Sequence, residues 1–185
     1  AERNCAIAGS VAVCENGNYY NRFYFVHPDG AVQHYDKKHL FTFGGEHKRF
    51  TAGTERVVVN FRGVRILLEV CYDLRFPVWS RNLGDYDMIL YVASWPTPRV
   101  DAWSALLRAR AIENQCYVAG VNRMGVDPAC EYSGGSAIID PYGKTIAECP
   151  WSRESAVSAD IDMEALQAFR KKFPVLDDAD PFTLI

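Results

Sequence analysis

A short apolar segment at 64–70, with the sequence VRILLEV, constrains the fold of this chain more than any other feature. Its branched aliphatic residues favour a buried strand, and Cys71 follows the segment directly. A polar break and then Phe76-Pro77 come next, which predicts a turn into a helix over 76–83. A thiol at a bend from strand to helix is exposed at the edge of a sheet, so Cys71 is a candidate nucleophile. The alternative is a buried structural cysteine.

Apolar segments separated by turn signals continue along the rest of the chain. We expect strands over 5–14, 19–26, 31–35, 56–61, 86–93, 116–122, 136–140, 145–148 and 156–161. Helices are expected over 101–115, capped by Asp101, and over 162–172, capped by Asp162, with a loop over 41–55. This mixture of hairpins and strand–helix alternation predicts a layered α/β fold with mixed sheets. The 185 residues fit a single domain, 1–185.

The composition argues against two classes of partner. The net charge of −3 is spread over interspersed signs without a basic block, so nucleic-acid binding is not expected. No apolar run approaches the ~18 residues of a membrane span, so no membrane association is expected either. The six cysteines form no C-x-x-C pair, and their scatter over apolar segments predicts reduced thiols and a cytoplasmic location.

Lys37, which follows an expected strand, is the candidate cation of the site. An ammonium beside Cys71 lowers the pKa of the thiol and stabilises an oxyanion, and the amide of Tyr72 is a second oxyanion donor. Because side chains alternate along a strand, Lys38 points outward if Lys37 and His39 share the inward face. The alternative for either lysine is a solvated surface charge.

Three further residues are candidates for the same site. Glu46, in a glycine-bearing segment, either holds a proton or orients another catalytic group, or is an exposed loop carboxylate. Arg75 follows the thiol closely and is suited to clamp a substrate carboxylate, unless it forms an ion pair with Asp73 or another local acid. Trp95 stands at the end of an expected strand, where ligand sites collect, and either walls a pocket or belongs to the core.

The histidines give no sign of a metal centre. The four of them, at 27, 34, 39 and 47, fall on different expected elements without metal-site spacing, so neither a metal nor an organic cofactor is predicted. His39 is the best candidate for a Cys–His peptidase pair, and a packed, hydrogen-bonded role is the favoured alternative.

Taken together, these segments resemble the carbon–nitrogen hydrolase (nitrilase) superfamily. The likeness rests on Lys37-x-His39-Leu40, the segment 70–77 (VCYDLRFP), Trp95-Pro96, the segment 108–114 (RARAIEN) and the segment 135–143, and it spans about 6–173. Within the superfamily, the segments 72–83 and 108–114 make the chain most similar to the bacterial omega-amidases.

The resemblance implies an α-β-β-α sandwich and a homodimer or larger homo-oligomer. In the family's Glu-Lys-Cys set, Lys37 matches the lysine, Cys71 the nucleophile and Glu46 a second glutamate. The first glutamate, the general base, matches no residue here, so we expect the chain to lack an N-terminal portion and to be inactive alone. The implied reaction releases ammonia from a small-molecule amide, the omega-amide of a 2-oxo dicarboxylic acid monoamide, through a cysteine thioester and without a cofactor.

Three other functions stay open. One is that of another amidase or a carbamoylase of the same superfamily, because Ser94 stands where the omega-amidase pattern more often has Asn. The second is a non-catalytic binding or assembly module that keeps the fold. The third is a Cys–His peptidase that uses His39.

Overall fold

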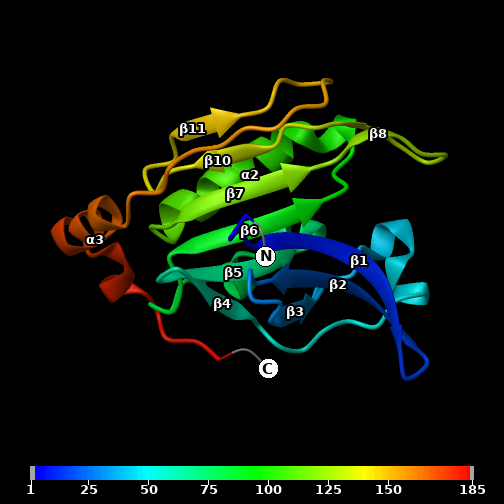
Figure 1. The fold of residues 1–185 in the computed structure, drawn as a ribbon, viewed down its shortest axis with the longest axis horizontal. Coiled ribbons are helices and arrows are strands. Elements are labelled where there is room, and N and C mark those ends of the chain that lie inside the picture. The colour runs from blue at the N-terminus through cyan, green and yellow to red at the C-terminus, as the bar shows by residue number, and fades with distance from the viewer. Residues whose placement is uncertain (1–2, 184–185) are drawn as a thin grey trace.

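The computed structural model describes residues 3–183 and has a six-stranded mixed sheet at its centre (Figure 1). In spatial order the strands are β11 (Thr145–Glu148), β10 (Ala137–Ile139), β7 (Tyr117–Asn122), β6 (Met88–Ala93), β5 (Val64–Val70) and β4 (Val58–Phe61). β5, β6 and β7 run parallel to one another, so their carboxyl ends meet at the same edge of the sheet.

A second, three-stranded antiparallel sheet contains β1 (Ile7–Glu15), β2 (Asn18–Val26) and β3 (Val32–Asp36). β1 and β2 join at Asn16-Gly17, where both residues have positive φ, as the predicted Asn-Gly hairpin turn requires. A separate hairpin of β8 (Met124–Val126) and β9 (Glu131–Ser133) extends beyond β7.

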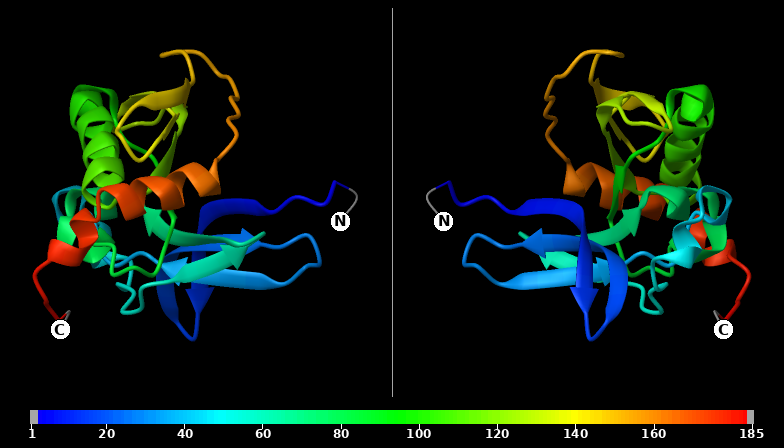
Figure 2. Two further views of the ribbon diagram at one scale, coloured as in Figure 1. Left: turned by 90° about the vertical axis from the view of Figure 1, so that its left-hand side faces the viewer. Right: turned by 90° about the vertical axis from the view of Figure 1, so that its right-hand side faces the viewer.

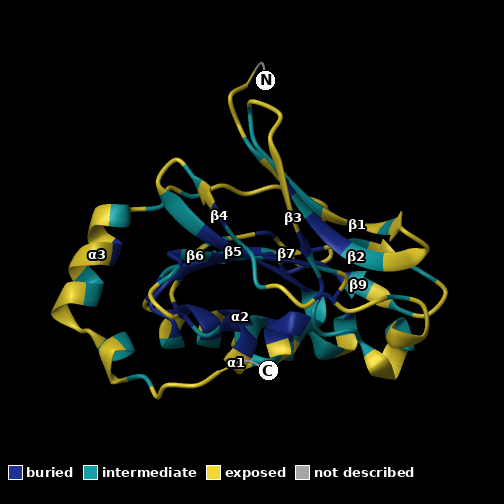
Figure 3. Ribbon diagram, turned by 90° about the horizontal axis from the view of Figure 1, so that it is seen from below, coloured by how far each residue is buried: buried dark blue, intermediate teal, exposed yellow. Residues whose placement is uncertain are grey.

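The core lies in two layers on either side of the six-stranded sheet. Helix α2 (Val100–Glu113) covers one face, and the three-stranded sheet packs against the other (Figure 2). Because side chains alternate along β5, Leu67 packs with Trp103 of α2, whereas Leu68 packs with Phe23 of β2. Figure 3 shows that burial is concentrated in the central strands and along α2.

The predicted α/β fold with mixed sheets is confirmed. One helical layer and two sheet layers, the arrangement expected of part of an α-β-β-α sandwich, lie within residues 3–183. Helix α3 (Met163–Lys172) lies at the amino ends of the parallel strands, and the Asp162 carboxylate caps it by accepting from the Ala165 amide at 2.8 Å, as predicted. Among the described residues, no helix has the length and apolar character needed to cross a bilayer.

The structure corrects the helices that surround Cys71 and α2. The helix expected over 76–83 is short, α1 (Pro77–Ser80), and a 3₁₀ helix, η3 (Cys71–Arg75), precedes it. Asp101 does not cap α2, because the helix begins one residue earlier and Asp101 lies in its first turn. A further 3₁₀ helix, η4 (Thr97–Arg99), leads directly into α2.

The structure differs from the expectations in two further segments, 156–161 and 124–133. The segment 156–161 joins no sheet, because it runs over the surface with Val157 exposed and no ladder partner. The β8–β9 hairpin was not predicted at all. The expected loop 41–55 contains two 3₁₀ turns, η1 (Thr42–Gly44) and η2 (Glu46–Lys48), and a last one, η5 (Val175–Asp178), follows α3.

Candidate active site

A cavity of about 500 Å³ opens at the carboxyl ends of β5, β6 and β7. Ligand sites in α/β sheets form at this edge because the loops that follow the strands converge there. All the site residues predicted from the sequence line this cavity: Lys37, Glu46, Cys71, Tyr72, Arg75 and Trp95. The structure therefore brings together residues from the end of β3, η2, η3 and the loop after β6.

Cys71 directly follows β5 and begins η3 in a left-handed conformation, with φ of 49°. A residue with a side chain adopts this conformation at a cost in energy, and such strain is common where a side chain must be held at a functional site. The tight bend presents the sulfur to the cavity, where the thiol donates to the Ser94 carbonyl at 3.9 Å. The predicted bend from strand to helix is confirmed, although the helix that follows is 3₁₀.

The protonation of the Cys71 thiol differs from the expectation. Burial raises the pKa of Cys71, and the charge of Lys37 and the hydrogen bond to Ser94 lower it by less. The expected lowering by the Lys37 cation is present, but burial outweighs it, so the net pKa is above that of a free thiol. A thiol in this state must lose its proton to a base before it attacks a carbonyl carbon.

Lys37 and Glu46 form an ion pair on the wall of the cavity. The Lys37 ammonium is 3% exposed and lies 2.6 Å from Glu46 Oε2. The same carboxylate accepts from the Phe41 amide at 2.6 Å and from Asn21 Nδ2 at 3.1 Å. Burial acts to raise the pKa of Glu46, but the Lys37 charge and these hydrogen bonds outweigh it and lower the pKa. Glu46 is thus an ionised group that fixes the ammonium, and the alternative of an exposed loop carboxylate is wrong.

The buried carboxylate of Asp73 connects the two segments that carry the lysine and the thiol. It accepts from the hydroxyl of Tyr35, two residues before Lys37, at 2.8 Å. It also accepts from the amide of Val70, directly before Cys71, at 3.0 Å. The first residue belongs to β3 and the second to β5, so one carboxylate sets the position of both segments. From the sequence, Asp73 was expected only as an alternative ion-pair partner of Arg75. Its position two residues after the nucleophile was the one signal of this role.

His39 has the packed, hydrogen-bonded role that was favoured. Its Nδ1 lies 2.8 Å from Asp73 Oδ1, and its ring stacks on Phe76 with centroids 3.8 Å apart. His39 is not among the described residues that line the cavity. The structure therefore gives no support to a Cys–His peptidase pair.

Arg75 and Trp95 form a stacked pair at the cavity. The Arg75 guanidinium carbon lies 4.9 Å from the centroid of the Trp95 ring. Asp73 bonds to other groups, so the alternative ion pair with Arg75 is wrong, and Arg75 forms no ion pair within residues 3–183. Trp95 is 3% exposed and packs in the core, yet it also lines the cavity. Both interpretations of this tryptophan are therefore correct.

Several residues of the site were missed from the sequence. Asn122 accepts from the Trp95 amide at 2.7 Å and donates to the Trp95 carbonyl at 3.0 Å, which fixes the back wall of the cavity. Arg99, Arg123 and Tyr132 also line it, the last two from the unpredicted hairpin region. For Arg123, the sequence offered one signal, its position directly after a buried strand. Among the described residues, no three acidic, histidine or cysteine side chains are grouped as a metal site requires.

Comparisons with known proteins agree with this geometry. The family model "Carbon-nitrogen hydrolase" matches residues 1–171. The chain is 54% identical to "Omega-amidase YafV" of Escherichia coli, covering 98% of this chain and 71% of that protein. It is 42% identical to "2-oxoglutaramate amidase" of Bacillus subtilis, covering 93% and 67%. Among solved structures, the CN-hydrolase superfamily protein XC1258 from Xanthomonas campestris is 47% identical with a TM-score of 0.95, covering 98% and 71%.

The fold and the cavity at its strand ends define a hydrolase that acts on amides. The chain belongs to the carbon–nitrogen hydrolase family, with the nitrilase-superfamily fold.

Proposed function

We propose that this chain carries the site of an amidase that acts through a thioester on Cys71. The deprotonated sulfur attacks the amide carbon, the S–C bond forms, and the C–N bond breaks as the nitrogen takes up a proton and leaves as ammonia. Water then cleaves the thioester, which returns the free thiol and gives a carboxylate. The observation that supports this proposal most is the common cavity of Cys71 and the Lys37–Glu46 pair.

Two donors are assigned to the oxyanion that forms during each step. The Lys37 ammonium is one, held against the cavity wall by Glu46. The Tyr72 amide is the other, because Tyr72 is in the first turn of η3 and the first amides of a helix have no acceptor within it. Each such donor lowers a barrier of this kind by roughly 3 kcal/mol.

The substrate class follows from the relatives and from Arg75. The relatives named omega-amidase and 2-oxoglutaramate amidase favour the omega-amide of a 2-oxo dicarboxylic acid monoamide. Such a substrate carries a carboxylate at the end away from the amide. Arg75 lines the cavity without an ionic partner among the described residues, and it is assigned to bind this carboxylate.

Glu46 is a poor general base for this reaction. It is the one carboxylate among the described residues that line the cavity, and its pKa is lowered. An efficient base has a pKa near the operating pH. The family's general-base glutamate has no match in these 185 residues. We therefore expect the 185-residue chain alone to release ammonia slowly or not at all.

The test is ammonia release from 2-oxoglutaramate by the whole gene product that contains this chain. We expect turnover in the wild type and none in Cys71→Ala, with both proteins folded by circular dichroism. Undiminished turnover in Cys71→Ala would refute the thioester. Turnover of unrelated amides in place of 2-oxoglutaramate would indicate another amidase or a carbamoylase, and a folded protein inactive on every amide would indicate a binding module. Homo-oligomer formation and a cytoplasmic location stay predictions, and size-exclusion chromatography tests the first.

A further inference from the structure

Three adjacent parallel strands are each followed by an arginine that lines the cavity. Arg75 comes after β5, Arg99 after β6 and Arg123 directly after β7. The carboxyl ends of these strands meet at one edge of the sheet, on the right-hand side of Figure 1, and the three arginines line the same cavity there. The arrangement is therefore a property of the sheet and does not depend on a single loop.

Each of these arginines lies over an aromatic ring. The distances from guanidinium carbon to ring centroid are 4.9 Å for Arg75 on Trp95, 5.5 Å for Arg99 on Phe41 and 4.4 Å for Arg123 on Tyr132. An aromatic face holds a guanidinium by cation–π attraction and leaves its N–H groups free at the edge of the plane. The rings therefore orient the three cations without neutralising them.

Protein carboxylates compensate the charge on this rim only in part. Glu46, the one carboxylate among the described residues that line the cavity, already pairs with Lys37. Neither Arg75 nor Arg99 has an ion pair within residues 3–183. Arg123 pairs with Asp127 at 3.7 Å, and that carboxylate also accepts from the Tyr132 hydroxyl at 2.8 Å, so Arg75 and Arg99 are the two arginines of the rim without an ionic partner among the described residues. The cavity thus has positive charge available for a ligand.

We propose that Arg99 and Arg123 determine specificity, and that with Arg75 they bind the anionic end of the amide substrate. A guanidinium binds a carboxylate through paired N–H groups, and the neighbouring carbonyl of a 2-oxo acid offers a further acceptor to a second guanidinium. An amino acid amide carries an ammonium at that position. The ammonium meets cations and no free carboxylate on this rim, so it is repelled. This inference rests on the proposed function only for the identity of the substrate.

The test measures binding of 2-oxoglutarate to the 185-residue chain by isothermal titration calorimetry. We expect Arg99→Gln and Arg123→Gln each to raise the Kd about tenfold, because each removes one charge-assisted contact. Arg99→Lys, which keeps the charge and loses the planar fork, falls between wild type and Arg99→Gln. Arg153→Gln is the matched control, since Arg153 is exposed, lies outside the cavity and removes the same charge.

Unchanged affinity in both cavity variants, or an equal loss in Arg153→Gln, would overturn the proposal. Each variant is checked by circular dichroism, and Arg99→Lys supplies the comparison if Arg99→Gln does not fold. With the whole gene product, the ratio of kcat/KM for 2-oxoglutaramate over glutamine should fall about tenfold in Arg123→Gln. The binding result does not require Cys71 chemistry. Failure of this proposal is therefore distinguishable from failure of the proposed reaction, which Cys71→Ala tests.

Discussion

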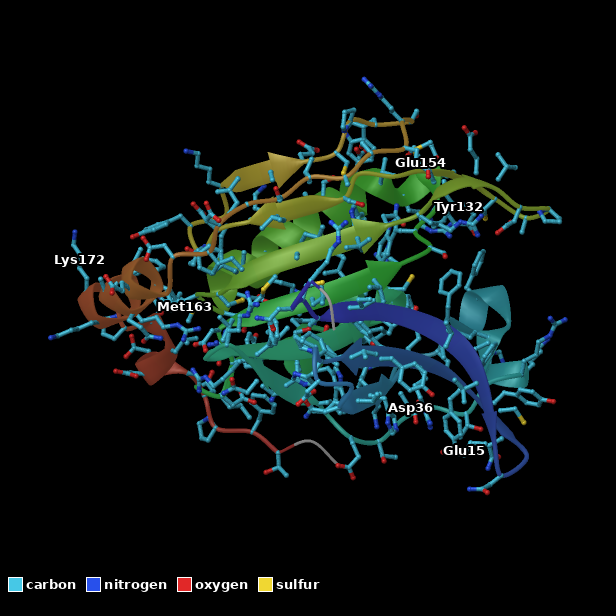
Figure 4. All side chains as sticks on the ribbon, viewed as in Figure 1. Glu15, Asp36, Tyr132, Glu154, Met163 and Lys172 are labelled. Atoms are coloured by element: carbon cyan, nitrogen blue, oxygen red, sulfur yellow. The ribbon has the colours of Figure 1, made fainter. Side chains whose placement is uncertain are left out.

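Arginine side chains have different partners at the two ends of the parallel strands. At the amino ends, the buried Asp87 carboxylate accepts from Arg65 at 2.7 Å and from Arg170 of α3 at 2.8 Å. At the carboxyl ends, Arg75 and Arg99 lie over aromatic rings and have no ionic partner within residues 3–183. Figure 4 shows the two ends on opposite sides of the molecule, with Met163 and Lys172 of α3 at one and Tyr132 at the other.

Buried carboxylates at the two ends also differ in whether an arginine pairs with them. Burial acts to raise the pKa of Asp87, but the arginines beside it outweigh burial and lower the pKa. Glu69, near the carboxyl end of β5, forms no ion pair within residues 3–183; one carboxylate oxygen accepts from the Ser80 hydroxyl at 2.9 Å, and the other has no hydrogen-bond partner among the described residues. Burial first, and then the charge of Asp73, raise the pKa of Glu69 to about 8. Paired charges therefore join elements of the fold at the amino ends, whereas at the carboxyl ends Glu69 is buried as the neutral acid, and Arg75 and Arg99 line the cavity without an ionic partner within residues 3–183.

The largest expected effect is on activity, in Lys37→Met. We expect kcat for ammonia release by the whole gene product to fall about 10²–10³-fold, because an oxyanion donor is lost. The matched control is Lys38→Met, since Lys38 is the adjacent lysine and lies over the Trp79 ring, away from the cavity. Equal losses in the two variants would mean that the ion pair at the cavity has no special role.

The next effect is on stability at the amino ends, in Asp87→Ala. Removal of the shared carboxylate leaves Arg65 and Arg170 without their partner, so we expect the free energy of unfolding to fall by about 3 kcal/mol. Urea titration measures the change. Binding of 2-oxoglutarate to the folded variant should be unaltered. A variant as stable as wild type would remove the contrast between the two ends.

The pH dependence of stability tests the unpaired acid, Glu69. An unfolded glutamate titrates near 4.5 and the folded one near 8, so between these values the unfolded state binds fewer protons. The free energy of unfolding therefore decreases as pH rises through this window, by at most about 1.4 kcal/mol between pH 6 and pH 7. Glu69→Gln, which imitates the neutral acid, should flatten this slope in urea titrations. Parallel slopes in variant and wild type would show that Glu69 is ionised in the fold.

The smallest effect is expected for Arg75→Gln on stability. Arg75 has no ionic partner among the described residues. The free energy of unfolding of the variant should therefore stay within about 0.5 kcal/mol of the wild-type value. The same variant should bind 2-oxoglutarate more weakly. A stability loss as large as that of Asp87→Ala would make Arg75 a structural residue.

Local patterns in the sequence predicted the centre of the fold and of the site. The segment 64–70, the bend at Cys71 and the strand before Lys37 have clear signals, and each is present in the structure. The hairpin at 124–133 was missed because its strands are three residues long and lack clear alternation. The strand expected at 156–161 failed for the opposite reason, since its composition is suitable but no neighbouring strand pairs with it.

The remaining site residues depend on tertiary structure. Apart from the position of Arg123 directly after a buried strand, nothing local distinguishes Arg99 and Arg123, which line the cavity, from Arg65 and Arg170, which pair with Asp87. That distinction follows from the order and direction of the strands, which no single segment specifies. The role of Asp73 also depends on tertiary structure, because its partner Tyr35 lies on a strand of the other sheet.

The most direct test of the central claim is mass spectrometry of the protein after mixing with 2-oxoglutaramate and quenching in acid. The account predicts an acyl adduct, with the mass of the substrate less ammonia, on the peptide that contains Cys71, and no adduct in Cys71→Ala. The adduct accumulates where the thioester is hydrolysed slowly, which we expect of the 185-residue chain alone. The chain and the whole gene product are therefore compared. Ammonia release by Cys71→Ala, or an adduct on another cysteine alone, would contradict the account.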